Sequence, residues 1–475
     1  MTTATMQAGQ PRGLWVLFAT EMWERFSYYG MRALLVLYLV SATGGTDNPG
    51  FGWSEGDAYR LYGLYTWAVY LTPIFGGLIA DRILGTHRSL VLGGVIIAAG
   101  HLTLAATELF ALEPGVPVGL DTSPGALVCF VSGLLLIIVG TGFFKPCAAV
   151  MVGQLYEEGD PRREGGFAIY YMGINVGGFL APLVAGTLGE TVGWHWGFGA
   201  AAAGMILGLL SYLWLRPRYL AGIGLAPERS SVRTSETTDA RPMLPLSTVE
   251  WQRIAVIVVL ALFGNMVFWA GFEQAGSSLN VFAAQSTDRT LWGLLAEPFP
   301  ATWYQTVNPG AIVLFAPLFA WFWTKLGERD LDPSTPMKFC LGLWLLGLAF
   351  IAMIAGSIEA QNGGLAGPQW LLITFVVVTW GELCLSPVGL AMVTRLAPPH
   401  LQSLLMGFWY FTFSFGNLLA GELARVSTRL QSGELTFVMD GLPGFFLMLV
   451  VFPVVVGTLL LLLVPWLKRW MHGEH

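Results

Sequence analysis

The chain has 475 residues, of which 55% are hydrophobic and only 11% are charged, and its mean hydropathy is +0.62. A soluble globular protein carries roughly 25% charged residues, so this composition excludes an ordinary soluble domain and predicts a membrane protein with many spans. The net charge is −6 and no dense basic cluster is present, which argues against nucleic acid as a partner.

Twelve apolar runs are long enough to cross a bilayer, since a spanning helix needs about 20 mostly apolar residues. They are expected near residues 13–40, 59–83, 88–110, 125–153, 164–190, 194–215, 251–284, 303–326, 337–357, 368–395, 401–428 and 442–470. The polar segment 1–12 does not resemble a secretory signal, so the first run is expected to remain as a helix. Four cysteines lie in or beside these runs without metal-ligand spacing, and we expect small buried side chains at Cys129, Cys147, Cys340 and Cys384.

A polar segment at residues 216–250, with several Arg, Ser, Thr and Pro, separates the first six runs from the last six. The pattern predicts an N-terminal six-helix bundle over 1–215, a flexible cytoplasmic linker over 216–250 and a C-terminal six-helix bundle over 251–475. Lys and Arg are concentrated in the alternate loops that include this linker. The positive-inside rule therefore places both termini in the cytoplasm.

The loop after the second run, residues 76–88, reads GGLIADRILGTHR. It resembles the cytoplasmic loop signature of the major facilitator superfamily, whose layout is also two six-helix halves joined by a central linker. We therefore expect an all-α membrane protein of that fold, with twelve transmembrane helices in two six-helix bundles. Asp81 in this loop is expected to act in gating, by capping a neighbouring helix end and pairing with an arginine.

The first predicted span carries charged and tyrosine side chains three, four and seven residues apart: Glu21, Glu24, Arg25, Tyr28, Tyr29 and Arg32. This spacing places them on one face of a helix over about three turns. Charges inside a span are costly and mark a functional site by default. The face is therefore expected to line a water-filled cavity or to meet charges on other helices.

Other spans carry few charges: Lys145 in the fourth, Glu273 in the seventh and Glu382 in the tenth, with Glu422 in the eleventh a weaker candidate near the surface. The cations thus belong to the N-terminal half, and two carboxylates belong to the C-terminal half. A cavity with this polarity suits a zwitterion with well-separated charges, such as a short peptide. A purely structural role is disfavoured, because buried ion pairs seldom stabilise more than apolar packing would.

Residues 21–30, EMWERFSYYG, resemble the first-span motif of the proton-dependent oligopeptide transporter (POT) family. Segments on the fifth, eighth and tenth spans are similar to its other signatures: FAIYYMGINVGG at 167–178, WYQTVNP at 303–309 and GELCLSPVGL at 381–390. The resemblance covers nearly the whole chain and implies a bacterial di-/tripeptide:proton symporter. Many bacterial members carry two additional helices between the halves, but residues 216–250 are too short and polar to form them. Animal members carry a large outer domain between the ninth and tenth spans, and residues 358–367 leave no room for it.

The resemblance implies a role for each residue that matches the family motifs. The residues with an implied role in proton coupling are Glu21, Glu24, Arg25 and Lys145. Substrate binding falls to Arg25, Tyr28, Tyr29, Arg32, Tyr70, Lys145, Asn175, Trp269, Asn308, Glu382, Ser386 and Trp409. Gating falls to Arg32 with Glu273, to Lys145 with Glu382, and to Asp81. In this scheme the cations receive the peptide carboxylate, Glu382 with the two asparagines receives the amino terminus, and the aromatic residues line side-chain pockets, although Tyr and Trp in spans more often serve packing or interface anchoring.

The implied protein works in a bacterial inner membrane with no cofactor or metal besides the coupling proton. Its partners are di- and tripeptides, protons and the lipid bilayer, and oligomerisation is not required. One alternative is a proton-coupled carrier of another small solute, such as nitrate or an amino-acid derivative, because plant relatives share the first-span motif. An enzyme or a non-transporting receptor is disfavoured, since the six histidines are scattered and no P-loop or nucleophile elbow is present.

Overall fold

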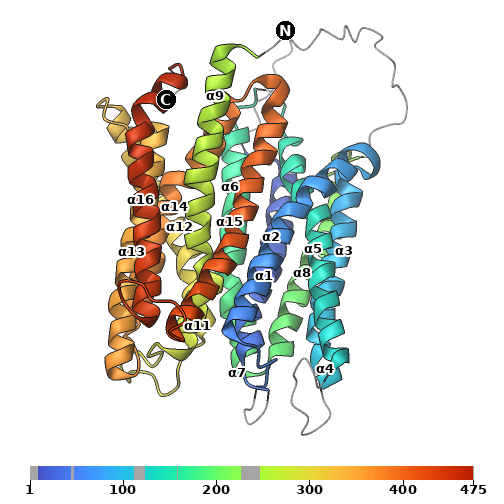
Figure 1. Cartoon of the computed structure of the whole chain (residues 1–475). Coiled ribbons are helices and arrows are strands. Elements are labelled where there is room, and N and C mark those ends of the chain that lie inside the picture. Colours follow the sequence, from blue (N-terminus) through green and yellow to red (C-terminus); the bar gives the residue numbers. More distant parts are fainter. Residues whose placement is uncertain (1–8, 44–47, 112–122, 158, 226–245, 474–475) are drawn as a thin grey trace, which may run out of the picture.

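The computed structural model describes residues 9–43, 48–111, 123–157, 159–225 and 246–473, and over these residues the regular structure is helical (Figure 1). The N-terminal half contains α1 (Arg12–Val40), α2 (Glu55–Ile79), α3 (Thr86–Ala105), α4 (Thr107–Ala111), α5 (Pro124–Gly153), α6 (Arg163–Ala181), α7 (Thr187–Thr191) and α8 (Trp194–Tyr219). Wide π-helical turns, η1 (Ala80–Leu84) and η2 (Pro182–Gly186), extend α2 and join α6 to α7.

The C-terminal half is built in the same way, with one span made of several short pieces. That span joins α9 (Thr248–Val259), the π-helical turn η3 (Leu260–Asn265), α10 (Met266–Phe272), η4 (Glu273–Gly276) and α11 (Ser278–Gln285). The remaining elements are η5 (Ala301–Thr306), α12 (Val307–Gly327), α13 (Thr335–Gly363), α14 (Gln369–Leu396), η6 (Pro399–Leu401), α15 (Gln402–Gln431) and α16 (Gly441–Trp470).

Eleven helical segments among the described residues are long and apolar enough to cross a membrane. The twelfth span is α1, which has 29 residues but carries at least three charged side chains in every 18-residue stretch. Its charges do not face lipid, because Glu21, Glu24 and Arg25 are each at most 3% exposed. The prediction of a multi-pass, all-α membrane protein with twelve spans is therefore confirmed.

The helices gather into two bundles that meet along a shared face. In the first, α1 packs on α6 and α8, and α3 packs on α5; in the second, α13 packs on α14 and α16. Across the interface α2 packs against α15, and α6 packs against α12. Figure 1 shows these helices running roughly parallel, with α7 and α11 at one end of the molecule and the C-terminus at the other. We call the end that holds α7 and η5 the distal end.

Helix limits differ from the predicted runs mainly at the linker. α8 continues to Tyr219 and α9 begins at Thr248, so both helices extend into the segment predicted as linker. α9 begins there because Ser247 forms a capping box with Glu250, with each side chain bonded to the other residue's backbone N–H. Residues 226–245, the centre of the predicted linker, lie outside the described residues.

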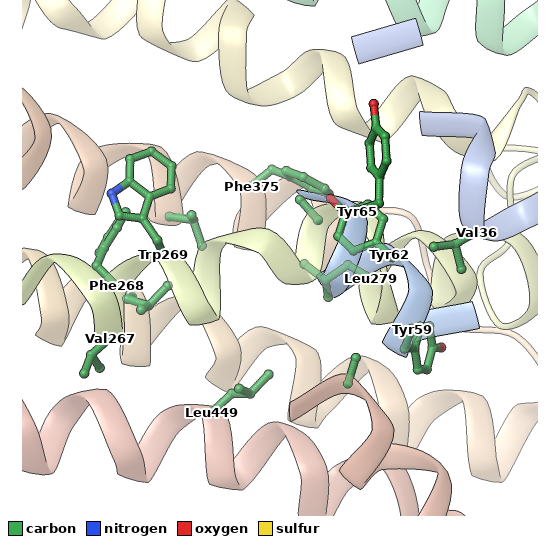
Figure 2. Close-up of a cluster of buried hydrophobic side chains, with 14 of the residues drawn as sticks. Val36, Tyr59, Tyr62, Tyr65, Val267, Phe268, Trp269, Leu279, Phe375 and Leu449 are labelled. Atoms are coloured by element: carbon green, nitrogen blue, oxygen red, sulfur yellow. The ribbon is translucent and has the colours of Figure 1, made fainter. Parts of the chain in front are cut away.

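Aromatic and aliphatic side chains from both bundles fill the core around the interface. Figure 2 shows part of it, with Tyr62 and Tyr65 of α2 near Phe375 and Leu279, and with Phe268 and Trp269 on α10. Tyr62 and Phe268 are completely buried. The side chains that surround the functional residues are thus large and closely packed.

Close approach of α2 and α5 depends on one glycine. Gly76 lies against Gly142 so tightly that an added Cβ would overlap the Gly142 carbonyl, whereas a Cβ on Gly77 would meet Pro146 at an ordinary 3.6 Å. We expect Gly76→Ala to force the helices apart and to cost about 1–3 kcal/mol of stability. Thermal unfolding in detergent should show a lower Tm for Gly76→Ala and no change for Gly77→Ala. Equal Tm shifts in the two variants would contradict this explanation.

Candidate functional site

The charged face of α1 is organised around Arg25. Its Nη2 donates to Glu24 Oε1 at 2.7 Å and its Nε donates to Glu24 Oε2 at 2.5 Å, which makes a two-point guanidinium–carboxylate pair. Glu21, one turn away, approaches Arg25 Nε at 3.4 Å. One cation therefore compensates two buried carboxylates on the same helix, and the group carries a net negative charge when both are ionised.

Tyrosine rings cover the cations of this face. The guanidinium carbon of Arg25 lies 5.0 Å from the ring centre of Tyr28 and 5.9 Å from that of Tyr29, and the guanidinium carbon of Arg32 lies 5.1 Å from Tyr29. A cation over an aromatic face is attracted by the ring quadrupole. The Tyr29 ring thus lies between the two arginines. Both tyrosines lie on the charged face, where the sequence predicted them.

Lys145 of α5 is held differently from the two arginines. Its Nζ lies 3.4 Å from the centre of the Tyr70 ring, and no carboxylate among the described residues comes within 4.0 Å of it. The predicted Lys145–Glu382 ion pair is therefore not formed in this conformation. A lysine without a carboxylate partner in a span is available to bind an anion or to pair with Glu24 or Glu21 after a rearrangement.

The predicted ion pair between Arg32 and Glu273 is present and crosses the bundle interface. Arg32 Nη1 donates to both carboxylate oxygens of Glu273 at 2.9 and 3.1 Å. Tyr62 of α2 also donates to Glu273, at 2.7 Å. Glu273 thus accepts hydrogen bonds from two helices of the opposite bundle, and this contact joins the halves on the distal side of the cavity.

A cavity of about 200 Å³ lies between the bundles, next to this ion pair. Many of the predicted substrate and gating residues line it: Tyr29, Arg32, Tyr70, Asn175, Trp269, Glu273, Asn308, Glu382 and Ser386. Its cationic group, Arg32, comes from the N-terminal bundle, and Glu382 comes from the C-terminal bundle. The lining thus holds a cation from the N-terminal half and carboxylates from the C-terminal half, with Arg32 paired to Glu273 in this conformation.

The acidic side of the cavity is held by hydrogen bonds from its neighbours. Asn308 of α12 donates through its single Nδ2 to Glu382 Oε2 and to Thr379 Oγ1, both at 2.9 Å. Asn175 on the other bundle donates to the Tyr171 carbonyl at 3.0 Å. Glu382 is 6% exposed, and its second oxygen accepts no hydrogen bond from the described residues. The carboxylate therefore retains acceptor capacity for an ammonium group.

Several predicted site residues do not line the cavity. Arg25, Tyr28 and Lys145 lie behind its wall, in contact with the lining residues Tyr29 and Tyr70. Trp409 is only 3% exposed and packs edge-on against Phe339, inside the C-terminal bundle. In this conformation Trp409 therefore belongs to the core and not to a side-chain pocket.

Asp81 lies far from the cavity, in the exposed π-helical turn η1. The part of the chain that the structure describes gives its carboxylate no ion pair within 4.0 Å. The predicted pairing of Asp81 with an arginine is thus not formed in this conformation, and its role in gating stays a prediction.

Other lining residues were not singled out from the sequence. They include Tyr171, Gln305, Thr374, Phe375 and Phe413. Tyr171 and Gln305 lie inside the quoted motifs, so the motifs contained the signal, but an apolar residue such as Phe413 in an apolar run carries none. Within the described residues, no group of three or more His, Cys, Asp and Glu side chains is arranged to hold a metal ion.

A second cross-bundle contact, at the distal end, involves residues that the sequence motifs do not single out. The carboxylate of Glu190 in α7 accepts hydrogen bonds from the backbone N–H groups of Ala301 and Thr302, at 2.8 and 2.9 Å, and from Thr302 Oγ1 at 2.7 Å. Arg289 lies 3.8 Å from the same carboxylate. An acidic residue thus occupies the start of η5 and α12, where unpaired N–H groups and the helix dipole favour negative charge.

The fold and the site together define a class of protein: a multi-pass membrane transporter with two six-helix bundles and a polar cavity between them. The family model that matches the chain is the POT family, over residues 87–222 and 234–438. The chain therefore belongs to the POT family, which confirms the resemblance seen in the motifs. Membership of a transporter family also confirms the prediction that the chain is not an enzyme.

Curated relatives match over nearly their whole length. The chain is 37% identical to the uncharacterized transporter YclF of Bacillus subtilis, over 98% of this chain and 96% of the relative. It is 34% identical to the peptide transporter YePEPT of Yersinia enterocolitica, with the same coverage. It is also 34% identical to a di-/tripeptide transporter of Lactococcus lactis, over 94% of this chain and 96% of the relative.

Solved structures with the same fold include transporters with bound small molecules. A peptide transporter of the POT family in complex with sulfate superposes with a TM-score of 0.83 at 33% identity, over 98% of this chain and 97% of that one. A variant of a POT peptide transporter in complex with alafosfalin gives the same identity and TM-score. A POT family transporter in complex with 5-aminolevulinic acid gives 0.81 at 28% identity, over 97% of this chain and 98% of that one.

Proposed function

We propose that this protein is a proton-coupled symporter that imports di- and tripeptides by alternating access. The observation that carries the proposal is the bipolar cavity, with Arg32 on one bundle and Glu382 with Asn308 on the other. A short peptide is a zwitterion with its charges at opposite ends. Relatives named as di-/tripeptide transporters support the same choice.

In this proposal each end of the peptide meets a different bundle. The carboxylate is received by Arg32 and, after rearrangement of the α1 face, by Arg25 and Lys145. The ammonium is received by Glu382, with Asn308 and Asn175 as polar neighbours. A ligand that bridges the bundles binds the closed arrangement better than an open one. Its differential affinity then biases the conformational equilibrium.

Proton coupling is proposed to act through Glu24. When Glu24 is ionised, it holds Arg25 in the two-point pair. Protonation removes that charge and frees Arg25 to attract the peptide carboxylate. A bound proton and a bound peptide then favour the same closed state, and the proton is the only coupling species, with no cofactor. One elementary charge that crosses 100 mV supplies about 2.3 kcal/mol, which is roughly a 50-fold accumulation.

We further propose that both termini face the cytoplasm of a bacterial inner membrane. The end that holds the C-terminus carries many cationic residues, including Arg82, Arg163, Lys338, Arg395 and Arg469. The distal end carries few, among them Arg60, Arg289 and Arg429. By the positive-inside rule the distal end is the outer one, and the cross-bundle contacts there close the outer side.

Uptake by the purified protein in liposomes tests the proposal. With an acidic exterior, labelled dialanine should accumulate inside above its external concentration, and dissipation of the proton gradient should abolish the accumulation. Competition by tripeptides, free amino acids, nitrate and 5-aminolevulinic acid then separates peptide transport from the alternative of another small solute. Absence of driven dipeptide uptake, with driven uptake of another panel member, would overturn the proposal.

Lys145→Ala tests the cation behind the cavity. We expect driven uptake of dialanine to fall by at least about tenfold, because the variant loses a cation from the site that receives the carboxylate. Lys325→Ala is the matched control, since that lysine pairs with Glu328 at 2.7 Å on an exposed part of α12. Unchanged uptake by Lys145→Ala would show that Lys145 has only a structural role.

A further inference from the structure

Asn265 is a polar side chain in the middle of a broken transmembrane segment. It is 1% exposed and ends the π-helical turn η3, directly before α10. Burial of an amide in an apolar span is costly unless each of its polar atoms finds a partner. π-helical turns are rare and occur frequently at functional sites. Both features mark Asn265 as a candidate functional residue.

The amide of Asn265 bonds to two helices at once. Its Oδ1 accepts a hydrogen bond of 2.9 Å from the indole Nε1 of Trp269, one turn ahead in α10. Its Nδ2 donates to Thr412 Oγ1 at 3.2 Å and to the Trp409 carbonyl at 3.4 Å, both on α15. Asn265 thus connects the indole of α10 to the backbone and a side chain of α15.

Both helices that Asn265 connects supply an aromatic wall of the cavity. Trp269 and Phe413 line it, and their ring centres lie 4.3 Å apart. Phe413 follows Thr412 directly in α15 and also contacts the Tyr70 ring of the other bundle, at 4.5 Å. The amide is therefore placed to fix the orientation of the indole next to Phe413.

We propose that Asn265 is a positioning residue that sets the width of the aromatic side-chain pocket and so determines which peptide side chains the transporter accepts. The inference rests on the proposed peptide transport. Without the Oδ1 acceptor, the buried indole N–H must find another partner, and the cavity is the polar space that it borders. Rotation of the ring into the cavity narrows the space for a bulky side chain and leaves a methyl side chain unaffected.

The test compares KM values for Ala-Ala and Ala-Phe in driven uptake by the full-length protein. Asn265→Leu is expected to raise the KM for Ala-Phe by about three- to tenfold, the range of one hydrogen bond, with little change for Ala-Ala and for kcat. Asn265→Asp keeps an acceptor for the indole and should retain the wild-type KM ratio. Asn417→Leu is the matched control, because Asn417 is fully buried in α15 and neither of its amide atoms has a partner among the described residues.

A double-mutant cycle with Trp269→Phe separates positioning from general destabilisation. In the Trp269→Phe background the indole N–H is absent, so Asn265→Leu should change the KM ratio no further. The inference is overturned if Asn265→Leu leaves the ratio at the wild-type value, if Asn417→Leu changes it equally, or if the two changes add in full.

A second measurement does not depend on transport. In protein labelled with 5-fluorotryptophan, the ¹⁹F signal of Trp269, assigned from its loss in Trp269→Phe, should move in Asn265→Leu and stay in place in Asn417→Leu. A signal that stays in place in Asn265→Leu overturns the positioning role. Failure of the wild type to transport dipeptides would instead count against the proposed function.

Discussion

A Glu24→Gln variant is expected to lose pH-driven accumulation of dialanine while it keeps exchange of internal for external peptide. The substitution removes the charge that holds Arg25 in the two-point pair, and the glutamine cannot take up and release a proton. At a proton-motive force of 100 mV the accumulation ratio should fall from roughly 50 towards 1, since no proton then moves with the peptide. Exchange needs no net proton movement, so counterflow of labelled peptide into peptide-loaded liposomes should persist.

The matched control is Glu422→Gln, the same chemical change in an exposed carboxylate of α15 that pairs with Arg425 at 2.8 Å. Its driven uptake should equal that of the wild type. Accumulation against the gradient by Glu24→Gln would show that the proton binds elsewhere, and Glu21, which lies 3.4 Å from Arg25, is then the next carboxylate to test.

The fold could be predicted from the sequence because hydropathy reports spans directly. Each predicted run coincides with a helical segment, and the differences occur at helix ends, where capping decides the limit. Ser247 and Glu250 start α9 before the apolar residues begin, so the helix is longer than its apolar part. The breaks inside the seventh span, from η3 to η4, leave no trace in hydropathy because the residues on both sides remain apolar.

The charged part of the site was also predictable, since a charge in an apolar helix is conspicuous. Arg32 and Glu273, 241 positions apart in the chain, meet as the family resemblance implied. Aromatic residues carry no comparable signal: Trp409 packs in the core, while Phe413, one turn further along α15, lines the cavity. Which of two such residues faces the cavity depends on how the helices are rotated, and that is decided by packing across the whole interface.

Polar residues at helix ends carry little information in a sequence. Glu190 lies near a predicted span boundary, where a surface glutamate is ordinary. Its importance depends on the backbone of Ala301 and Thr302, more than 100 residues away. Backbone N–H groups are present at every helix start, whichever residues form it. The sequence therefore does not show which of them pairs with a distant carboxylate, and the pairing can be recognised only in the folded chain.

Glu190→Ala is expected to shift the protein towards the state that is open at the distal end. The carboxylate accepts three hydrogen bonds from the opposite bundle, and hydrogen bonds to charged groups contribute about 1.5–3 kcal/mol each before rehydration of the separated groups is considered. Gly186 lies so close to Thr302 that an added Cβ would overlap its hydroxyl, so the bundles touch here without intervening water. A shift of about tenfold in the open-to-closed ratio requires only about 1.4 kcal/mol of this contact.

Spin labels at Val192 and Val438, exposed residues at the distal end of the two bundles, can report this ratio through their distance distribution. The long-distance fraction should grow in Glu190→Ala, and less so in Glu190→Gln, which keeps one acceptor oxygen. Glu422→Gln is the control, since Glu422 also faces the opposite bundle but lies 3.9 Å from Arg60 on an exposed surface, where ion pairs contribute little. A distribution unchanged in Glu190→Ala would mean that other cross-bundle contacts hold the distal end closed, such as Glu273 with Arg32 and the Asn280 amide on the Ala33 carbonyl. Additional opening when Arg32→Ala is combined with Glu190→Ala would show that both contacts hold it.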